Sequence, residues 1–449
     1  MNLHPAEHAE QAAHGAASLR EEDGAPPPGW SRFARRYALA LLVLSAILNQ
    51  VDRQVVSILV EPIKREFSLS DSQMGLLTGA AFALVYAFAA FPVGRALDAG
   101  PRKAIFSACI VLWSASTAAA GVATSYVGLL VSRIGVAIGE SGAVPAQHSM
   151  VSDLYPGRRL PMALALITLG SAFGVAASLF TGGFLVEHFG WRTVFVAVGA
   201  PGLLLAALLF FGSKEPPRRT LLGDHATEGR PPIGEVIRYL WSLKTYRVVL
   251  IAGVLSGISG GALNAWGPSF LIRVHHLTPS QIGLWLGLAT ALGLGCGALV
   301  SGQLSTIMGA RDIRWYLGIS GTFSILCAPA GLLIALAPTP QVSILAVFFY
   351  QFCTVMHVPP TAAIVQSLAK PRMRGMATAA TAFTSVLGVG LGPLAMGMLT
   401  DAFAGMHGPL AIRGALALIV LAVAVAGAIY LLGNRWVRQE YARVAQSTS

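Results

Sequence analysis

Four charged residues interrupt two apolar segments of the chain, and their types suit ion pairing and proton transfer. Asp52 and Arg53 lie in the first segment, and Arg133 and Glu140 lie in a later one. The spacing between Arg133 and Glu140 puts these two residues on one face of a helix, about 10 Å apart in height. A charge inside a bilayer costs roughly 3 kcal/mol or more, so such residues face the protein interior and pair. We therefore expect all four side chains to meet in one cavity.

Proton coupling is the chemistry that this cluster favours. Burial and a neighbouring guanidinium act in opposite directions on the proton affinity of a carboxylate. An acid whose arginine partner changes between two conformations can therefore take up and release a proton. This makes Asp52 and Glu140 candidates for proton coupling, and Arg53 and Arg133 candidates for substrate binding or charge pairing. The alternative is a permanent ion pair that joins two helices without titrating.

A second set of polar residues lies in the later half of the chain. Asn264 and Trp266, and Gln351 and His357, occupy segments that correspond to those of the four charges. They are candidates for substrate binding, although each also fits a packing residue that makes a hydrogen bond. Since this half lacks matching acids and bases, we expect the charged group of a substrate to bind in the first half.

Signatures of catalysis, metal binding and cofactor binding are not evident. The pair His275 and His276 lacks further residues at metal-ligand spacing. Glycine-rich stretches lie inside apolar helices, where no helix N-terminus is free to bind phosphate. We therefore expect neither an enzyme nor a bound metal or cofactor.

The composition predicts an all-α membrane protein. Hydrophobic residues make up 55% of the 449 residues and charged residues 11%, whereas soluble domains carry about 25% charged residues. The apolar runs are long enough for helices that cross a bilayer and too continuous for barrel strands. Twelve spans are expected, near residues 37–60, 73–94, 104–123, 126–148, 161–186, 192–212, 246–272, 279–303, 314–337, 341–367, 376–402 and 411–432.

The net charge of +11 has a topological explanation that needs no nucleic acid. Lys and Arg gather in the tails and in alternate loops, which predicts both termini on the cytoplasmic side of the cell membrane. The expected divisions are a disordered tail (1–35), a six-helix bundle (36–212), a cytoplasmic linker (213–245), a second six-helix bundle (246–433) and a C-terminal tail (434–449).

The two bundles repeat each other in sequence. Residues 69–76 match residues 277–284, each at the entrance to the second helix of its half. Later matches at one common offset pair Gly174, Gly183, Glu187 and Phe189 with Gly388, Gly397, Asp401 and Phe403. Parallel repeats of this kind are a known design of transporters, with the substrate site at the interface between the halves.

One loop resembles a motif of the major facilitator superfamily. Gly94, Asp98, Arg102 and Lys103 match the family pattern, whereas Ala99 and Pro101 depart from it. The resemblance implies two pseudo-symmetric six-helix bundles that act by alternating access, commonly as a monomer. It also implies that this loop gates the conformational change by stabilising the outward-facing state.

Within that superfamily the chain is similar to bacterial members of the spinster family. The matching pieces are residues 49–54, 133–141, 152–156, 190–195 and 266–273. This resemblance implies transport of an amphiphilic lipid, such as a lysophospholipid or a sphingosine-phosphate-like molecule, governed by the charges of the first and fourth helices. Two alternatives remain, which are a proton-coupled carrier of a small hydrophilic organic anion or drug, and a membrane sensor that binds without transporting.

Overall fold

The computed structural model describes residues 29–155, 159–218, 233–370 and 373–448, and these residues form an all-helical membrane protein. By length and hydropathy, eleven helical segments of this described part could cross a membrane. One of them, α8 (Leu160–Gly212), holds two spans, because its residue Gly190 has a non-helical backbone with φ 78° and ψ 164°. The predicted total of twelve spans is therefore confirmed.

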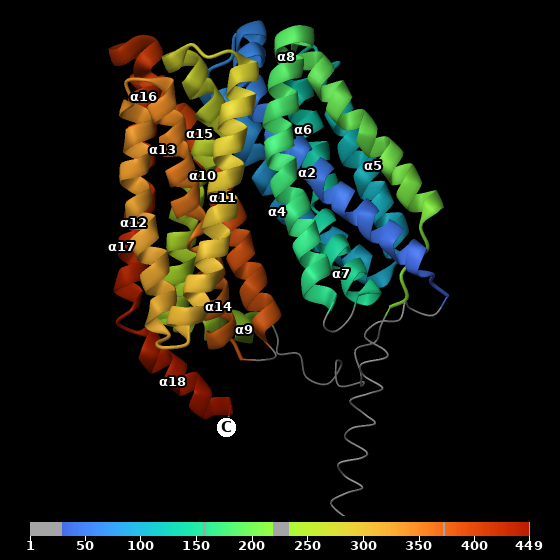
Figure 1. Ribbon diagram of the computed structural model, residues 1–449, viewed down its shortest axis with the longest axis vertical. Helices are drawn as coiled ribbons and strands as arrows, with labels where there is room; N and C mark the ends of the chain where they lie inside the picture. Colours follow the sequence, from blue (N-terminus) through green and yellow to red (C-terminus); the bar gives the residue numbers. More distant parts are fainter. Residues whose placement is uncertain (1–28, 156–158, 219–232, 371–372, 449) are drawn as a thin grey trace, which may run out of the picture.

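Two helical halves stand side by side (Figure 1). The first contains α2 (Arg32–Phe67), α3 (Asp71–Gly75), the π-helical turn η1 (Leu76–Ala80), α4 (Ala81–Ala99), α5 (Arg102–Ala120), α6 (Tyr126–Glu140), α7 (Ala143–Leu154) and α8. The second contains α10 (Lys244–His275), α11 (Pro279–Gly309), α12 (Arg314–Leu336), α13 (Pro340–Val355), α14 (Val358–Leu368), α15 (Arg374–His407), the short turn η5 (Gly408–Leu410), α16 (Ala411–Ile419) and α17 (Leu421–Gly433).

Two further helices lie at one end of the molecule, which we call the terminal face (Figure 1). They are α9 (Ile233–Ser242), inside the predicted linker, and α18 (Val437–Thr448), inside the predicted C-terminal tail. Most of the predicted N-terminal tail lies outside the described residues. Among the described residues the first helix, α2, begins at Arg32, because the side chain of Ser31 accepts a hydrogen bond from the backbone nitrogen of Ala34 and so caps it.

The fourth span of each half is broken near its middle. In the first half α6 ends at Glu140 and α7 begins at Ala143, and in the second half α13 ends at Val355 and α14 begins at Val358. Such breaks inside a membrane are tolerated where the backbone lines a cavity or is buried in protein. Glu140 and His357, both singled out from the sequence, therefore lie at equivalent breaks.

The repeated sequence at the second helix of each half is a capping box. Ser70 and Gln73 exchange hydrogen bonds of 3.1 and 2.9 Å at the start of α3, and Thr278 and Gln281 exchange bonds of 3.4 and 3.1 Å at the start of α11. Each box satisfies two backbone N–H groups that the helix leaves unpaired.

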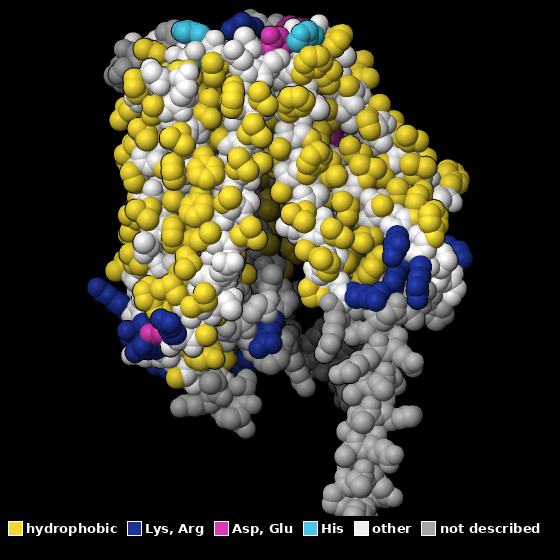
Figure 2. All heavy atoms as spheres, viewed as in Figure 1, with side chains coloured by type: hydrophobic (Ala, Val, Ile, Leu, Met, Phe, Trp, Pro, Cys, Tyr) yellow, Lys and Arg dark blue, Asp and Glu magenta, His cyan; other side chains and the backbone are white. Residues whose placement is uncertain are grey.

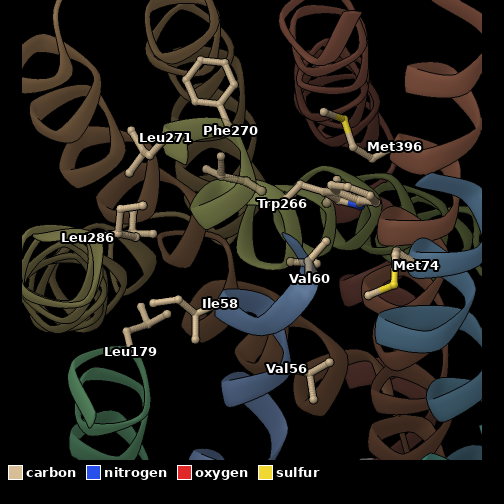
Figure 3. Close-up of a cluster of buried hydrophobic side chains, with 14 of the residues drawn as sticks. Val56, Ile58, Val60, Met74, Leu179, Trp266, Phe270, Leu271, Leu286 and Met396 are labelled. Atoms are coloured by element: carbon tan, nitrogen blue, oxygen red, sulfur yellow. The ribbon is translucent and has the colours of Figure 1, made fainter. Parts of the chain in front are cut away.

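The later repeat joins the halves at the face opposite the termini. Asp401 of α15 accepts hydrogen bonds from the backbone nitrogens of Asp71 and Ser72 at 3.0 and 2.8 Å. Its counterpart Glu187 of α8 accepts one from the backbone nitrogen of Ser280 at 2.8 Å. Each half therefore caps the second helix of the other. An apolar cluster joins both halves, and Figure 3 shows members of it from α2, α3, α8, α10, α11 and α15.

The outer surface suits a bilayer. Hydrophobic side chains cover the flanks of both halves, and Lys and Arg side chains gather toward the terminal face (Figure 2). Between the halves a hollow opens toward the terminal face, whereas the halves meet at the opposite face (Figure 2).

Candidate functional site

The first and fourth helices carry a buried ion pair. Nε and Nη2 of Arg53 donate to Oε2 of Glu140 at 3.1 and 3.0 Å. The Glu140 side chain is fully buried, whereas 33% of the Arg53 side chain is exposed. Glu140 is thus shielded from solvent, whereas Arg53 faces open space.

The other two predicted charges lie against this pair. Asp52 is buried, and its Oδ1 has no hydrogen-bond partner among the described residues. Its carboxyl interacts electrostatically with both Glu140 and Arg133. Arg133 is also buried, and its guanidinium lies 4.9 Å from the ring centroid of Phe82. The structure therefore brings together all four residues singled out in the sequence, with equal numbers of positive and negative charges.

Aromatic rings from α4 support the two guanidinium groups. Arg53 lies 5.1 Å from the ring centroid of Phe82 and 5.1 Å from that of Tyr86. A cation over an aromatic face gains electrostatic attraction, and more of it where water is excluded. Phe82 thus touches both arginines. No sequence signal marked it, because it is one of many aromatic residues in apolar helices.

A cavity of about 220 Å³ lies between the halves, and we call it the central cavity. Its polar lining includes Arg53, Gln54 and Arg133 from the first half and Asn264 and Ser385 from the second. The remaining lining is largely apolar, with Val56, Phe82, Ala83, Ala265, Val386, Val389 and Pro393. The arrangement offers a wall with two cations next to apolar surface.

The four substrate-binding candidates of the second half lie in three different places. Asn264 lines the central cavity, and its Oδ1 accepts a hydrogen bond of 2.9 Å from Nε2 of Gln351. Trp266 is buried and donates to the backbone oxygen of Pro393 at 2.9 Å, so it packs α10 against α15. His357 lines a separate cavity within the second half. The structure does not bring these residues into the charged cluster.

The motif loop between α4 and α5 contacts the first half and the segment that follows α8. Arg102 is buried and donates to Asp153 at 2.5 Å and to the backbone oxygen of Pro216 at 3.1 Å. Lys103 donates to the backbone oxygens of Phe210 and Ser213, at 2.8 and 3.0 Å.

The first two residues of the motif contribute less. A Cβ at Gly94 would meet open space, and the backbone oxygen of Asp98 accepts a hydrogen bond from Arg218. Arg218 also bonds the backbone oxygens of Leu97 and Gly100 and thereby caps the end of α4. In this conformation the loop fastens α5 to the segment after α8.

A network of ion pairs closes the face opposite the termini, and sequence reasoning missed it. Arg273 of α10 donates to Glu61 at 2.8 Å and to the two oxygens of Asp71 at 2.8 and 2.7 Å. Lys64 adds a bond of 2.5 Å to Asp71. We call Glu61, Lys64, Asp71 and Arg273 the gate cluster. It joins residues from both halves that are about 200 positions apart, a pairing that one sequence does not reveal.

The described part of the chain contains no group of three or more His, Cys, Asp and Glu residues that could hold a metal ion. The site itself consists of two guanidinium groups that line the central cavity, which both halves build, and two buried carboxyls beside them.

Comparison with protein families and curated proteins gives consistent matches. The model of the Major Facilitator Superfamily matches residues 42–393. An MFS-type efflux pump of Mycolicibacterium smegmatis is 33% identical over 411 residues, which cover 90% of this chain and 93% of that protein. A hexuronate transporter of Bacillus subtilis is 25% identical over 391 residues, covering 84% of this chain and 91% of the transporter.

Solved structures give the same match. A bacterial homologue of the human lysosomal transporter Spinster, crystallised in an inward-facing and unoccupied conformation, superposes with a TM-score of 0.83 and 28% identity. The match covers 92% of this chain and 99% of that one. The occupied form of a bacterial Spinster homologue, also inward-facing, gives a TM-score of 0.80 and 27% identity.

Proposed function

Because the chain belongs to the major facilitator superfamily and has a spinster-type structure, we propose that it is a proton-linked transporter of an amphiphilic anion. Its family consists of multi-pass membrane transporters and not of enzymes. The anion binds at Arg53 and Arg133, and Glu140 carries the coupled proton. The anionic substrate and the coupled proton are the parts that we add to the family assignment.

The exposure of Arg53 carries this proposal. A guanidinium matches a phosphate or carboxylate with two parallel hydrogen bonds. Arg53 reaches the central cavity with 33% of its side chain exposed, although it already binds the buried carboxylate of Glu140. A substrate anion that enters the cavity therefore competes with Glu140 for the same guanidinium.

Charge balance links that competition to a proton. Asp52, Arg53, Arg133 and Glu140 sum to zero when all four are ionised, so an added monoanion leaves the cluster with a net negative charge. A buried charge without compensation is costly, and a carboxyl in that position takes up a proton instead. Glu140 is the acid that loses its partner when Arg53 turns to the substrate. We therefore expect one proton to bind together with a substrate of net charge −1.

Alternation then follows from differences in affinity. A ligand shifts a conformational equilibrium only as far as it binds one state more tightly than the other. The gate cluster and the caps from Glu187 and Asp401 hold the face opposite the termini closed. We place the terminal face in the cytoplasm, since it carries the excess of Lys and Arg. The motif loop, which contains Arg102 and Lys103, then acts as the gating element on the cytoplasmic side.

Two observations bear on the substrate. The apolar lining beside Arg53, including Val56, Val386 and Val389, suits the tail of an amphiphile, and the spinster resemblance favours a lysophospholipid or sphingosine-phosphate-like lipid. The second candidate is a small organic anion. It is favoured by the modest cavity of about 220 Å³ and by relatives that are named for hexuronate and galactonate.

Uptake into proteoliposomes distinguishes the two candidates. We would compare sphingosine phosphate and lysophospholipid with hexuronate and galactonate, using wild type and Arg53→Gln. The lipid proposal predicts saturable lipid uptake that Arg53→Gln abolishes and that the sugar acids do not inhibit. Uptake of the sugar acids without lipid uptake would replace the lipid by the small anion. Wild-type uptake that Arg53→Gln leaves intact would overturn the anion site itself.

A further inference from the structure

The second half contains a cavity of its own, of about 210 Å³, which we call the side cavity. It lies among α10, α14, α15 and α17, and Ser385 lines both this cavity and the central one. Its polar lining consists of His357, Thr361, Gln366, Thr378, Thr381, Ser385 and Tyr430. This lining contains no charged residue, in contrast to the arginine wall of the central cavity.

Most of these hydroxyl groups have already used their protons. Thr361 donates to the backbone oxygen of His357 at 2.7 Å, and Thr378 to that of Arg374 at 3.0 Å. Thr381 and Ser385 donate to backbone oxygens one turn earlier, at 2.9 and 3.0 Å. A hydroxyl oxygen that donates once keeps lone pairs with which it accepts. These groups therefore offer mainly acceptors to a ligand.

His357 adds another acceptor. Its Nδ1 lies 2.6 Å from the backbone oxygen of Thr354, which accepts and does not donate. Nδ1 therefore carries a proton, and in the neutral ring Nε2 is left as an acceptor. The neighbouring Gln366 donates one N–H of its Nε2 to Thr378 at 2.7 Å, which leaves its carbonyl oxygen to accept and its second N–H to donate.

Tyr430 is the group in this lining that calls for a partner. Its side chain is fully buried, its ring centroid lies 6.2 Å from that of His357, and its hydroxyl has no hydrogen-bond partner among the described residues. A buried hydroxyl without a partner costs free energy. A ligand group that both donates and accepts, such as a hydroxyl, would satisfy it.

We propose that the side cavity binds the part of the substrate that carries hydrogen-bond donors, meaning hydroxyl or ammonium groups, while the anionic group lies at Arg53. This inference rests on the proposed function, because it takes the anion site as given. It narrows the substrate to an anion that also bears hydrogen-bond donors. Acceptors in the second half and guanidinium groups in the first then fix the orientation of the molecule.

Matched pairs of ligands test the inference on the full-length protein. The lipid pair is sphingosine phosphate, which has an ammonium and a hydroxyl group, and an alkyl phosphate of equal chain length. The sugar-acid pair is galactonate and hexanoate. Wild type should bind the donor-bearing member of at least one pair about tenfold more tightly, the equivalent of one or two hydrogen bonds. The pair that shows this preference identifies the source of the ligand.

Tyrosine variants locate the preference. Tyr430→Phe should reduce it about fivefold, the usual effect of one hydrogen bond, and leave the affinity for the donor-free member unchanged. Tyr350→Phe is the matched control, since it also removes a buried hydroxyl of the second half, one that lies 2.6 Å from the hydroxyl of Ser259 and outside the side cavity. Ser385→Ala gives a second reading if Tyr430→Phe folds poorly.

Two results overturn the inference, and a third identifies its premise as the failure. Equal affinity within both pairs, or an equal loss for both members in Tyr430→Phe, contradicts a donor-binding side cavity. In either case, donor-free anions that still bind and lose affinity in Arg53→Gln would show that the proposed anion site stands without the side cavity. If none of the four ligands binds, both the proposed function and the inference fall.

Discussion

In a Glu140→Gln variant, Arg53 keeps its place at the cavity wall but loses the carboxylate to which two of its nitrogens donate. The substitution changes the charge and keeps the size of the side chain. It therefore isolates the competition between Glu140 and the substrate anion. In the wild type, an anion reaches the free guanidinium only when Glu140 is protonated. In the variant no carboxylate competes with the substrate for the guanidinium at any pH.

The size of the effect follows from the geometry. At 3.0 Å and an effective dielectric constant of about 20, the attraction between the two charges is about 5.5 kcal/mol before desolvation is subtracted. An anion that binds to Arg53 while Glu140 is ionised would disrupt this ion pair, so much of the attraction would be subtracted from its binding free energy. Binding therefore proceeds with one proton, and above the pH at which Glu140 ionises the wild-type affinity should fall about tenfold per pH unit. The slope for Glu140→Gln should be close to zero.

Equilibrium binding of sphingosine phosphate, measured in detergent or nanodiscs between about pH 5 and pH 9, reads out this slope. Asp52→Asn is the matched control, because Asp52 is equally buried but does not bind Arg53. It should change the overall affinity and keep the slope. A wild-type slope that survives in Glu140→Gln would refute the reasoning. A slope that vanishes in Asp52→Asn and survives in Glu140→Gln would move the proton to Asp52.

Three further substitutions probe the conformational elements. Arg273→Gln breaks the gate cluster and should cost the closed form about 2 kcal/mol of stabilisation, which raises the ratio of open to closed form about thirtyfold. Distances between spin labels on the two halves report this ratio, and unchanged distances would contradict the role of the cluster. Gly75→Leu should also hold that face open, because any Cβ at this position collides with the backbone oxygen of Pro393, and an unaltered closed form would show that the contact is dispensable. Arg102→Ala removes a buried cation and should destabilise the protein by about 3 kcal/mol in thermal unfolding, a cost that a loop mobile in this conformation would not show.

The number and order of the spans could be predicted because long apolar runs have few alternatives in a bilayer. The breaks within the fourth spans could not. Gly and Pro residues stand close to both breaks, at Gly142, Pro145, Pro359 and Pro360. Proline also occurs inside unbroken helices of this chain, at Pro62 and Pro92, so it does not mark a break by itself. The breaks depend on packing around the cavity. The repeat was visible in the sequence, but its purpose was not. Glu187 and Asp401 bind the opposite half, which only the folded arrangement brings within reach.

The candidate site, too, could be predicted from the sequence only in part. Charges inside apolar segments are costly, so the sequence identified the members of the cluster. It did not identify the pairing of Glu140 with Arg53, because the rotation of each helix about its axis depends on contacts such as that of Gly174 with the backbone of Ile47. The contribution of Phe82 and the unpartnered hydroxyl of Tyr430 also depend on three-dimensional placement, and neither leaves a signal in one sequence.

The most direct test of the account is the movement of protons with substrate. Proteoliposomes that contain wild type or Glu140→Gln would be loaded with a pH indicator and given sphingosine phosphate, with and without an imposed pH gradient. The account predicts that wild type moves protons together with the lipid and is driven by the gradient, whereas Glu140→Gln binds the lipid without proton movement or response to the gradient. Lipid transport by wild type that proceeds without protons, at a rate independent of the gradient, would contradict it.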